Sequence, residues 1–134
     1  MFGPWRMRRE IRAAQQLLTE LTGQPPRYFR APAGLRNPFL EPVLCTEGLQ
    51  LAAWTRRGFD TRNGDHAGRV AQRLMRNLSA GDVLLLHDGN SGVDAVGKPH
   101  CTTVLPELLA RIADEGLRCV TLRAGMAARD LRTA

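Results

Sequence analysis

The apolar residues of this chain repeat with two different periods in turn, and this alternation limits the folds that it can adopt. Over residues 11–21 they recur at the spacing of one buried helix face. Over residues 83–86 they form an unbroken run, which is typical of a strand covered on both sides. Helical segments that alternate with such runs predict an α/β fold of βα units with a largely parallel sheet.

The first two expected helices are bounded by residues with strong capping preferences. The first covers residues 11–21 and ends at Gly23, because glycine readily adopts the left-handed conformation that terminates helices. The second begins where Asn37 can act as N-cap and Pro38 can occupy the first helical position, and it ends at Gly48.

Two more helices are expected further along the chain. Asp65 is the predicted N-cap of the third helix. Thr103 is the predicted N-cap of the fourth, which has Pro106 in its first turn and Gly116 at its end. Four strands are expected between the helices, at residues 27–31, 49–54, 83–87 and 117–122.

The length of the chain, 134 residues, predicts one domain over residues 1–134. A closed α/β barrel needs about eight strands. Four strands are therefore expected to form either a small open sheet or one part of a barrel. Residues 124–134 are interpreted as a polar tail that can form a frayed helix.

The positive charge of the chain, a formal +6, is carried almost entirely by arginine, because Lys98 is the only lysine. A basic surface can attract nucleic acid. Here the arginines occur in every segment, and aromatic residues for base stacking make up only 5% of the chain. We therefore expect no specific nucleic-acid partner.

The cysteines and the apolar runs give expectations about location. Cys45, Cys101 and Cys119 are far apart and form no C-x-x-C pair, so they are interpreted as free thiols, mostly in the core, in a reducing compartment. No apolar run is long enough to span a bilayer, and the first residues lack the pattern of a signal peptide. A cytoplasmic location is expected.

His87 is the leading candidate for chemistry, because it directly follows the apolar run of residues 83–86. In α/β folds the carboxyl ends of the strands carry the ligands, and histidine side chains titrate near neutral pH. The same position in the fold selects Arg30 and Asp60. The alternatives remain open: a histidine bonded only to backbone, an exposed arginine and a solvated carboxylate.

Three other residues are weaker candidates. Asp88 could orient His87 or bind a cation, although Asp-Gly is also ordinary turn chemistry. His66 and His100 each stand in a polar loop and are expected to be exposed. Residues 89–92, Gly-Asn-Ser-Gly, lack the Lys-Ser/Thr of a phosphate loop, so no nucleotide site is expected.

Three motifs in order give these residues a common interpretation. FRAPAG at residues 29–34, a tryptophan followed by Phe-Asp at 54–60, and LLLHDG at 84–89 resemble the later motifs of the polysaccharide deacetylase family. This is the NodB-homology domain of carbohydrate esterase family 4, and the resemblance covers about residues 8–123. It implies the C-terminal part of a distorted (β/α) barrel and a hydrolase that removes N-acetyl groups from amino sugars.

The resemblance also implies roles for individual residues. His87 matches the general acid that protonates the departing amine, and Asp60 matches the aspartate that tunes it. Arg30 matches the arginine that orients the catalytic base, and Leu85 matches the leucine that lines the acetyl pocket. Further substrate-binding positions implied by the same motifs are Pro32, Gly34, Trp54 and Asp88.

The chain departs from the family pattern in ways that bear on activity. The family holds a divalent metal, usually zinc, through one Asp and two His, beside an Asp that acts as general base. This chain has no Asp-Asp pair and no H-x-x-x-H, so these groups are expected upstream of Met1, and no metal ligands are evident here. Ala33 and Thr61 stand where the family usually has an aromatic residue and a tryptophan.

Two functions follow from this comparison. The first is a metal-dependent carbohydrate deacetylase of which this chain is the C-terminal part, with the activity of the chain alone left open. The second is a non-catalytic remnant that binds a sugar or a partner chain. Because a missing half would expose apolar sheet edges and helix faces, we expect a homo-oligomer or pairing with an N-terminal half.

Overall fold

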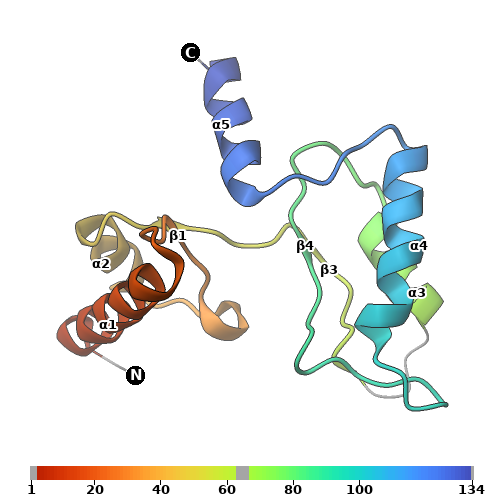
Figure 1. Ribbon diagram of the computed structural model, residues 1–134, viewed down its shortest axis with the longest axis horizontal. Helices are drawn as coiled ribbons and strands as arrows, with labels where there is room; N and C mark the ends of the chain where they lie inside the picture. Colours follow the sequence, from red (N-terminus) through yellow and green to blue (C-terminus); the bar gives the residue numbers. More distant parts are fainter. Residues whose placement is uncertain (1–2, 63–66, 134) are drawn as a thin grey trace. The chain divides into compact units, whose positions relative to one another are not determined.

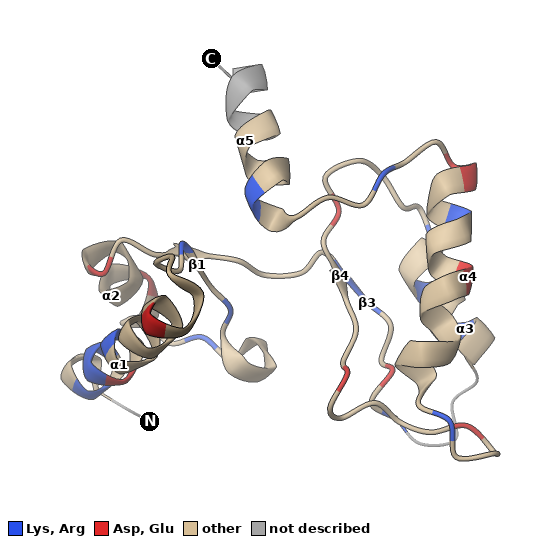
Figure 2. Cartoon of the chain, in the orientation of Figure 1, with Lys and Arg blue, Asp and Glu red and all other residues tan. Residues whose placement is uncertain are grey.

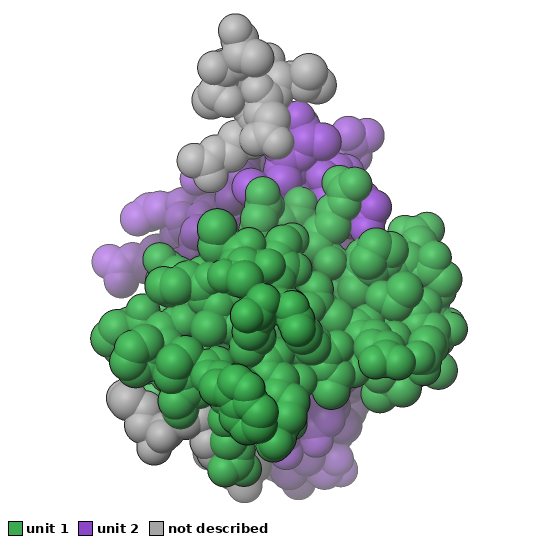
Figure 3. Space-filling view, turned by 90° about the vertical axis from the view of Figure 1, so that its left-hand side faces the viewer, with its two compact units in different colours: residues 1–53 green, residues 54–134 purple. Residues whose placement is uncertain are grey.

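The computed structural model describes residues 3–62 and 67–133. The chain divides into two compact units, residues 1–53 and 54–134, which are coloured separately in Figure 3. Each unit has its own hydrophobic core and its own pair of short parallel strands. The single domain expected over residues 1–134 stays a prediction.

The first unit packs two helices against one strand pair (Figure 1). Its elements in order are α1 (Pro4–Thr22), β1 (Tyr28–Phe29), a 3-10 turn (Pro32–Gly34), α2 (Leu40–Thr46) and β2 (Gln50–Leu51). In the parallel pair of β1 and β2, Tyr28 lies opposite Gln50 and Phe29 opposite Leu51. The buried core consists of Ile11, Ala31, Leu40, Val43, Leu44 and Leu49.

Glu47, directly after α2, ties the two helices of this unit together. Its carboxylate accepts hydrogen bonds from the side chains of Arg8 and Arg12 on α1, the latter at 2.6 Å from Nε. The Arg12 guanidinium, with that of Arg8, lowers the pKa of Glu47 below its ordinary value. Charge pairing thus supports the contact that the apolar face of α1 makes with α2.

The C-terminal ends of these two helices agree with the sequence, whereas α1 begins at Pro4 instead of residue 11. Gly23 ends α1 in the left-handed conformation (φ 70°) and donates its N–H to Thr19 at 2.9 Å, and Gly48 (φ 69°) follows α2. The predicted N-cap at Asn37 is wrong, because α2 begins at Leu40. The Asn37 side chain instead accepts a bond from the Phe39 N–H at 3.0 Å, which makes a turn ahead of the helix.

The second unit pairs β3 with β4 and packs α3 against α4 (Figure 1). Its elements are β3 (Arg56–Arg57), α3 (Ala67–Met75), β4 (Leu84–Leu85), α4 (His100–Asp114) and α5 (Leu122–Thr133). The strands are parallel, with Arg56 opposite Leu84 and Arg57 opposite Leu85. The core consists of Val70, Ala71, Leu74, Val104, Leu108 and Ile112, which all lie on α3 and α4.

Strand β3 lies in a polar stretch that the sequence did not predict as a strand. Arg56 holds it in place, because its Nε donates to Asp82 at 2.6 Å and its terminal nitrogens bond to the carbonyls of Arg76 and Asn77 after α3. Thr55 also donates to Asp82, at 2.6 Å. The Thr55 hydroxyl, with the Arg56 guanidinium, lowers the pKa of Asp82 to about 2.

The C-terminal part of this unit differs from expectation. Residues 117–121 form no strand, and α5 begins at Leu122, within the segment predicted to be extended. No described strand pairs with this segment, and Val120 is exposed. The polar tail expected at residues 124–134 belongs to α5 up to Thr133.

Helix α4 begins three residues before the predicted N-cap, Thr103. Pro99 occupies the N-cap position and His100 the first turn, so Pro106 lies inside the helix. Proline has no N–H to donate to the preceding turn, which leaves a gap in the helical hydrogen-bond ladder at Pro106. The third helix, α3, contains Val70, Leu74 and Met75 of the apolar face expected of it but ends before the fourth expected residue, Leu78. Its predicted cap, Asp65, lies outside the described residues.

The fold class is α/β with parallel strand pairing, as predicted. The strands are much shorter than expected, since each has two residues, and the described residues show two separate pairs instead of a barrel. Among the described helices none is both long and apolar enough to cross a membrane. Lys and Arg residues occur in both units (Figure 2).

The cysteines are free, as predicted, but their expected place in the core is wrong. Cys45 and Cys119 are exposed, and Cys101 is half-buried on α4. Small apolar side chains fill the core in their place, among them Ala31 and Ala71.

Candidate functional site

The structure brings two of the predicted site residues into direct contact. Asp60 lies three residues after β3 and is fully buried, and His87 lies two residues after β4. The carboxylate of Asp60 accepts two bonds from His87, one from the backbone N–H at 2.7 Å and one from ring Nδ1 at 3.0 Å. The alternative of a solvated carboxylate at Asp60 is therefore wrong.

Parallel pairing explains why these two residues meet. Because β3 and β4 run in the same direction, their carboxyl ends lie at one edge of the strand pair. Leu84 and Leu86 pack against the core formed by α3 and α4. Side chains point alternately to the two sides of an extended chain, so Leu85 points away from this core. His87, two residues later, lies on the same side as Leu85.

The contact with Asp60 determines what the His87 ring can do. An ionised carboxylate can only accept hydrogen bonds, so Nδ1 carries the proton and Nε2 is left for other partners. Nε2 has no hydrogen-bond partner among the described residues, and the His87 side chain is 35% exposed. The ring is thus anchored on one side and accessible on the other.

Tight packing before Asp60 positions its carboxylate. A Cβ on Gly58 would come within 2.7 Å of Val70 on α3, so the chain can approach that helix only without a side chain there. The next residue, Phe59, has a positive φ of 59°, which is uncommon for an aromatic residue. The guanidinium carbons of Arg57 and Arg62 each lie 4.7 Å from the centre of the Phe59 ring. Backbone strain of this kind is concentrated at functional sites.

The loop after His87 holds two further candidates. The Asp88 carboxylate is exposed and accepts the N–H of Gly89 at 2.7 Å, the contact expected of turn chemistry. The prediction that His100 is exposed is wrong: it is fully buried at the start of α4. His100 lies four residues before Val104 on the apolar face of α4, and this spacing could have identified it. His66 lies outside the described residues.

The predicted substrate-binding residues fall in both units. Leu85 is buried in β4, and Trp54 is half-buried just before β3. Pro32 and Gly34 form the exposed 3-10 turn of the first unit, in which Ala33 has a positive φ of 53°. The role of these residues in substrate binding stays a prediction.

Arg30 lies in the first unit, directly after β1. Its side chain is exposed, and its Nε donates to the carbonyl of Ala52 at 3.2 Å. This bond links the ends of β1 and β2, and the exposure of the side chain fits the alternative of an exposed arginine. Its role in orienting a catalytic base stays a prediction.

The described residues do not fit a metal site. They contain no group of three or more His, Cys, Asp or Glu side chains that could hold an ion. Both oxygens of Asp60 are already bonded to His87. The zinc that the family resemblance implies therefore has no ligand set in the described part of this chain.

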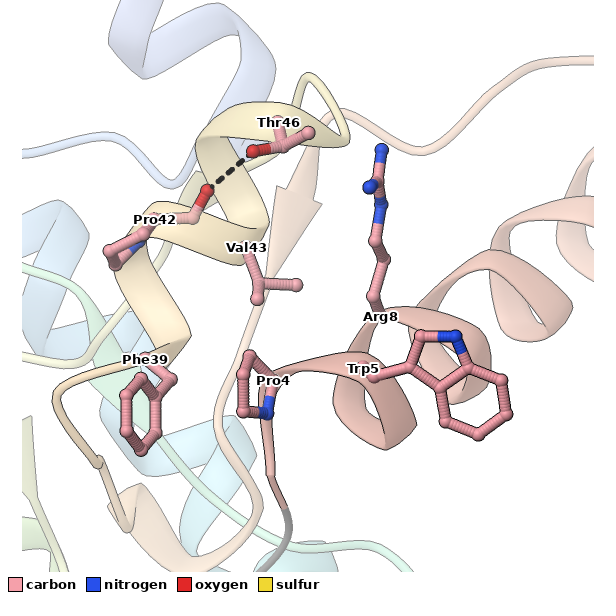
Figure 4. A pocket seen from close by; sticks show the side chains of 7 residues that line it. All are labelled: Pro4, Trp5, Arg8, Phe39, Pro42, Val43 and Thr46. Atoms are coloured by element: carbon pink, nitrogen blue, oxygen red, sulfur yellow. Dashed lines mark hydrogen bonds between the residues drawn. The ribbon is translucent and has the colours of Figure 1, made fainter.

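A hollow of about 340 Å³ lies between the start of α1 and α2 in the first unit. Pro4, Trp5, Phe39 and Val43 are among the side chains that line it (Figure 4). None of its lining residues is a predicted site residue. The hollow therefore adds nothing to the candidate site.

Comparison with known proteins agrees with the resemblance seen in the sequence. The family model described as polysaccharide deacetylase matches residues 2–51. This match includes Arg30, Pro32 and Gly34 but ends before Asp60 and His87. No curated protein matches the chain at a significant level.

Solved structures share the fold. A family 4 carbohydrate esterase from Streptomyces lividans, in complex with acetate, is 26% identical, with a TM-score of 0.76 over 90% of this chain and 58% of that chain. Peptidoglycan deacetylase PdaC from Bacillus subtilis is 19% identical, with a TM-score of 0.77 over 99% and 60%. A CE4 family pseudoenzyme from Bacillus anthracis is 17% identical, with a TM-score of 0.75 over 88% and 38%.

The fold is thus that of the family 4 carbohydrate esterases. This chain spans less than two thirds of the length of each of these three structures. The match of the family model to residues 2–51 and the shared fold both support the resemblance to the polysaccharide deacetylase family.

Proposed function

We propose that this chain supplies the proton-donating side of a carbohydrate deacetylase that removes N-acetyl groups from amino sugars. The observation that carries the proposal is the fully buried Asp60 carboxylate bonded to both the backbone and the ring of His87. A half-exposed histidine anchored by a buried carboxylate is the arrangement that general acid catalysis needs.

The chemistry assigned to the chain is one proton transfer. When the tetrahedral intermediate of amide hydrolysis collapses, the C–N bond breaks and its electron pair stays on nitrogen. The protonated His87 ring donates its Nε2 proton to that nitrogen, so the product leaves as a neutral amine. Asp60 remains ionised, keeps Nδ1 protonated and stabilises the imidazolium before the transfer.

A divalent metal, zinc in the family, would polarise the acetyl carbonyl and activate water. Since the described residues do not fit a metal site, we assign no step through the metal to them. The proposed partners are an N-acetylated carbohydrate and either a second copy or a complementary N-terminal half. A cytoplasmic location remains part of the proposal.

The second candidate function is a non-catalytic module that binds a sugar or a partner chain. The lack of a metal-ligating group among residues 3–62 and 67–133 favours it. The fold is compatible with that function, because it is shared with a structure described as a pseudoenzyme.

Titration of the ¹⁵N-labelled chain with an N-acetylglucosamine oligosaccharide tests sugar binding. We expect backbone amide shifts at residues 85–88 and at Asp60, with weaker binding in His87→Ala than in the control Asn90→Ala, which changes an exposed residue of the same loop. Absence of shifts at these positions would overturn both sugar-binding functions.

Acetate release from the same oligosaccharide, with zinc and a complementary N-terminal half added, separates the two functions. Release that is lost in His87→Ala but kept in Asn90→Ala supports the deacetylase. Binding without release supports the non-catalytic module, and release that is unchanged in His87→Ala contradicts the assigned proton transfer.

A further inference from the structure

A chain of hydrogen bonds connects the first turn of α4 to the buried carboxylate residue. The N–H of Gly92 donates to the carbonyl of Asp60 at 2.7 Å. The carbonyl of Gly92 accepts the N–H of His100 at 2.8 Å. Gly92 therefore bonds on one side to the residue that anchors His87 and on the other to the start of a 15-residue helix.

Gly92 has no room for a side chain. A Cβ there would lie 2.5 Å from the carbonyl oxygen of Arg62 and 3.1 Å from Cδ2 of His100. Its φ is outside the left-handed region, so glycine is required by space and not by backbone conformation. Gly89, in the same loop, offers a matched comparison, because a Cβ there would meet nothing within 4 Å.

Ser91 adds a second connection between the same elements. Its Oγ accepts the N–H of Cys101 on α4 at 3.0 Å, and its hydroxyl can donate to the Gly92 carbonyl at 3.1 Å. Asp60 lies close to the same hydroxyl, with its carbonyl oxygen 3.5 Å from Oγ. Two adjacent loop residues thus join the start of α4 to Asp60.

His100 completes the arrangement at a cost in stability. It is fully buried, and neither ring nitrogen has a hydrogen-bond partner among the described residues. An apolar side chain would avoid the penalty of unpaired buried polar atoms. The ring packs beside Gly92, where it helps to close the space in which a Cβ would stand.

We propose that Gly92 and His100 are positioning residues for the Asp60–His87 pair. They press the loop of residues 89–92 against the Asp60 backbone and so hold its carboxylate at the distance and angle that keep Nδ1 of His87 protonated. This inference rests on the proposed function, in which that proton fixes the ring for donation from Nε2.

Exchange of the His87 Nδ1 proton with solvent, followed by NMR on the full chain with ¹⁵N-labelled histidine, tests the inference. In Gly92→Ala we expect exchange to be faster by about tenfold, the factor that corresponds to losing one hydrogen bond of ordinary strength. In Gly89→Ala the exchange rate should equal that of the parent chain. An unchanged rate in a folded Gly92→Ala variant overturns the inference.

Two milder variants keep the test decisive if Gly92→Ala does not fold, which its backbone amide spectrum would show. Ser91→Ala removes the second connection, and His100→Ala removes the ring beside Gly92, without adding atoms. Faster exchange in both supports the inference, and parental rates in both overturn it.

The same spectra separate this inference from the proposed function. If the parent chain itself lacks a protonated Nδ1 at His87, the acid pair does not exist and the proposed function fails. If the parent has that proton and the variants keep it, the pair stands and only the role of Gly92 and His100 is overturned.

Discussion

At the scale of single residues, the molecule buries one carboxylate completely and pairs each of its oxygens with one histidine. Asp60 reaches its position through Gly58, which passes close to α3, and through the strained backbone of Phe59. A buried carboxylate is tolerated only when its oxygens are well paired. The contact with His87 is therefore expected to stabilise the folded chain.

Replacing Asp60 by alanine should cost about 1–3 kcal/mol of unfolding free energy, because the backbone N–H and the ring Nδ1 of His87 lose their acceptor. Urea denaturation measures this loss. The matched control is Asp88→Ala, since the Asp88 carboxylate is exposed and bonds only to the adjacent Gly89 among the described contacts. Equal stability of the two variants would contradict the burial of Asp60.

Replacing His100 by leucine should leave the chain at least as stable as the parent, because leucine has no polar atoms that need partners. The change removes two buried nitrogens that lack partners among the described residues and keeps an apolar side chain of similar volume. Thermal unfolding followed by circular dichroism provides the measurement. A clear loss of stability would contradict the unpaired state of the imidazole.

At the scale of secondary-structure elements, polar side chains hold β3 against β4, because β3 itself contains no apolar residues. Arg56 bonds to Asp82 before β4 and to the carbonyls that follow α3, so one side chain joins three segments. Thr55 adds its own bonds to Asp82 and to the backbone of Val83.

This network predicts a pH dependence of stability in the acid range. The pKa of Asp82 is about 2 in the folded chain against 3.8 for the unperturbed group, so its contribution is complete above pH 3.8 and is lost as the pH falls toward 2. We expect a loss on the order of 1 kcal/mol, since solvent screens part of the pairing. Urea denaturation at several pH values should show this loss, and Asp82→Asn should reduce it. An equal acid-induced loss in the variant would contradict the assignment.

The elements also show what the sequence could and could not predict. The apolar stripe of α1 with Gly23 behind it, and the run ending at His87, are local signals, and both lead to the right element type. Strand β3 is held by long-range bonds of Arg56, which no local pattern reveals. Residues 117–122 have the composition of a strand, but a strand needs a partner to pair with, and no described strand pairs with them.

The candidate site was also predictable only in part. Strand-end logic selected Asp60 and His87, and the parallel register of β3 and β4 brings them together. It also selected Arg30, whose described contact is with Ala52. His100 was missed because the apparent helix start at Thr103 placed it in a loop, whereas Pro99 is the residue that precedes the helix.

At the scale of the whole molecule, the chain corresponds to only part of the family 4 esterase structures that share its fold. It spans 58% of the Streptomyces lividans structure and 60% of the Bacillus subtilis structure. Several large apolar side chains are exposed on its helices, namely Trp5, Leu17, Leu18, Leu21, Leu105 and Leu109. Exposed apolar surface of this kind favours association.

We therefore expect the purified chain to self-associate. Sedimentation equilibrium over a range of concentrations should show an average mass that rises above 14.8 kDa, the mass of one chain. Added salt should not dissolve the assembly, because the hydrophobic effect drives it. A monomer at every concentration would contradict this expectation.

The most direct test of the account is the protonation pattern of the His87 ring in the full chain, read from its ¹⁵N chemical shifts at a pH where the ring is neutral. The account predicts a proton on Nδ1 and a bare Nε2, because the Asp60 carboxylate lies 3.0 Å from Nδ1. In Asp60→Leu, which has no acceptor, this pattern should give way to the mixture of tautomers typical of a free imidazole. A parent chain with its proton on Nε2, or one whose ring is unchanged in the variant, would contradict the central claim that Asp60 prepares His87 to donate a proton.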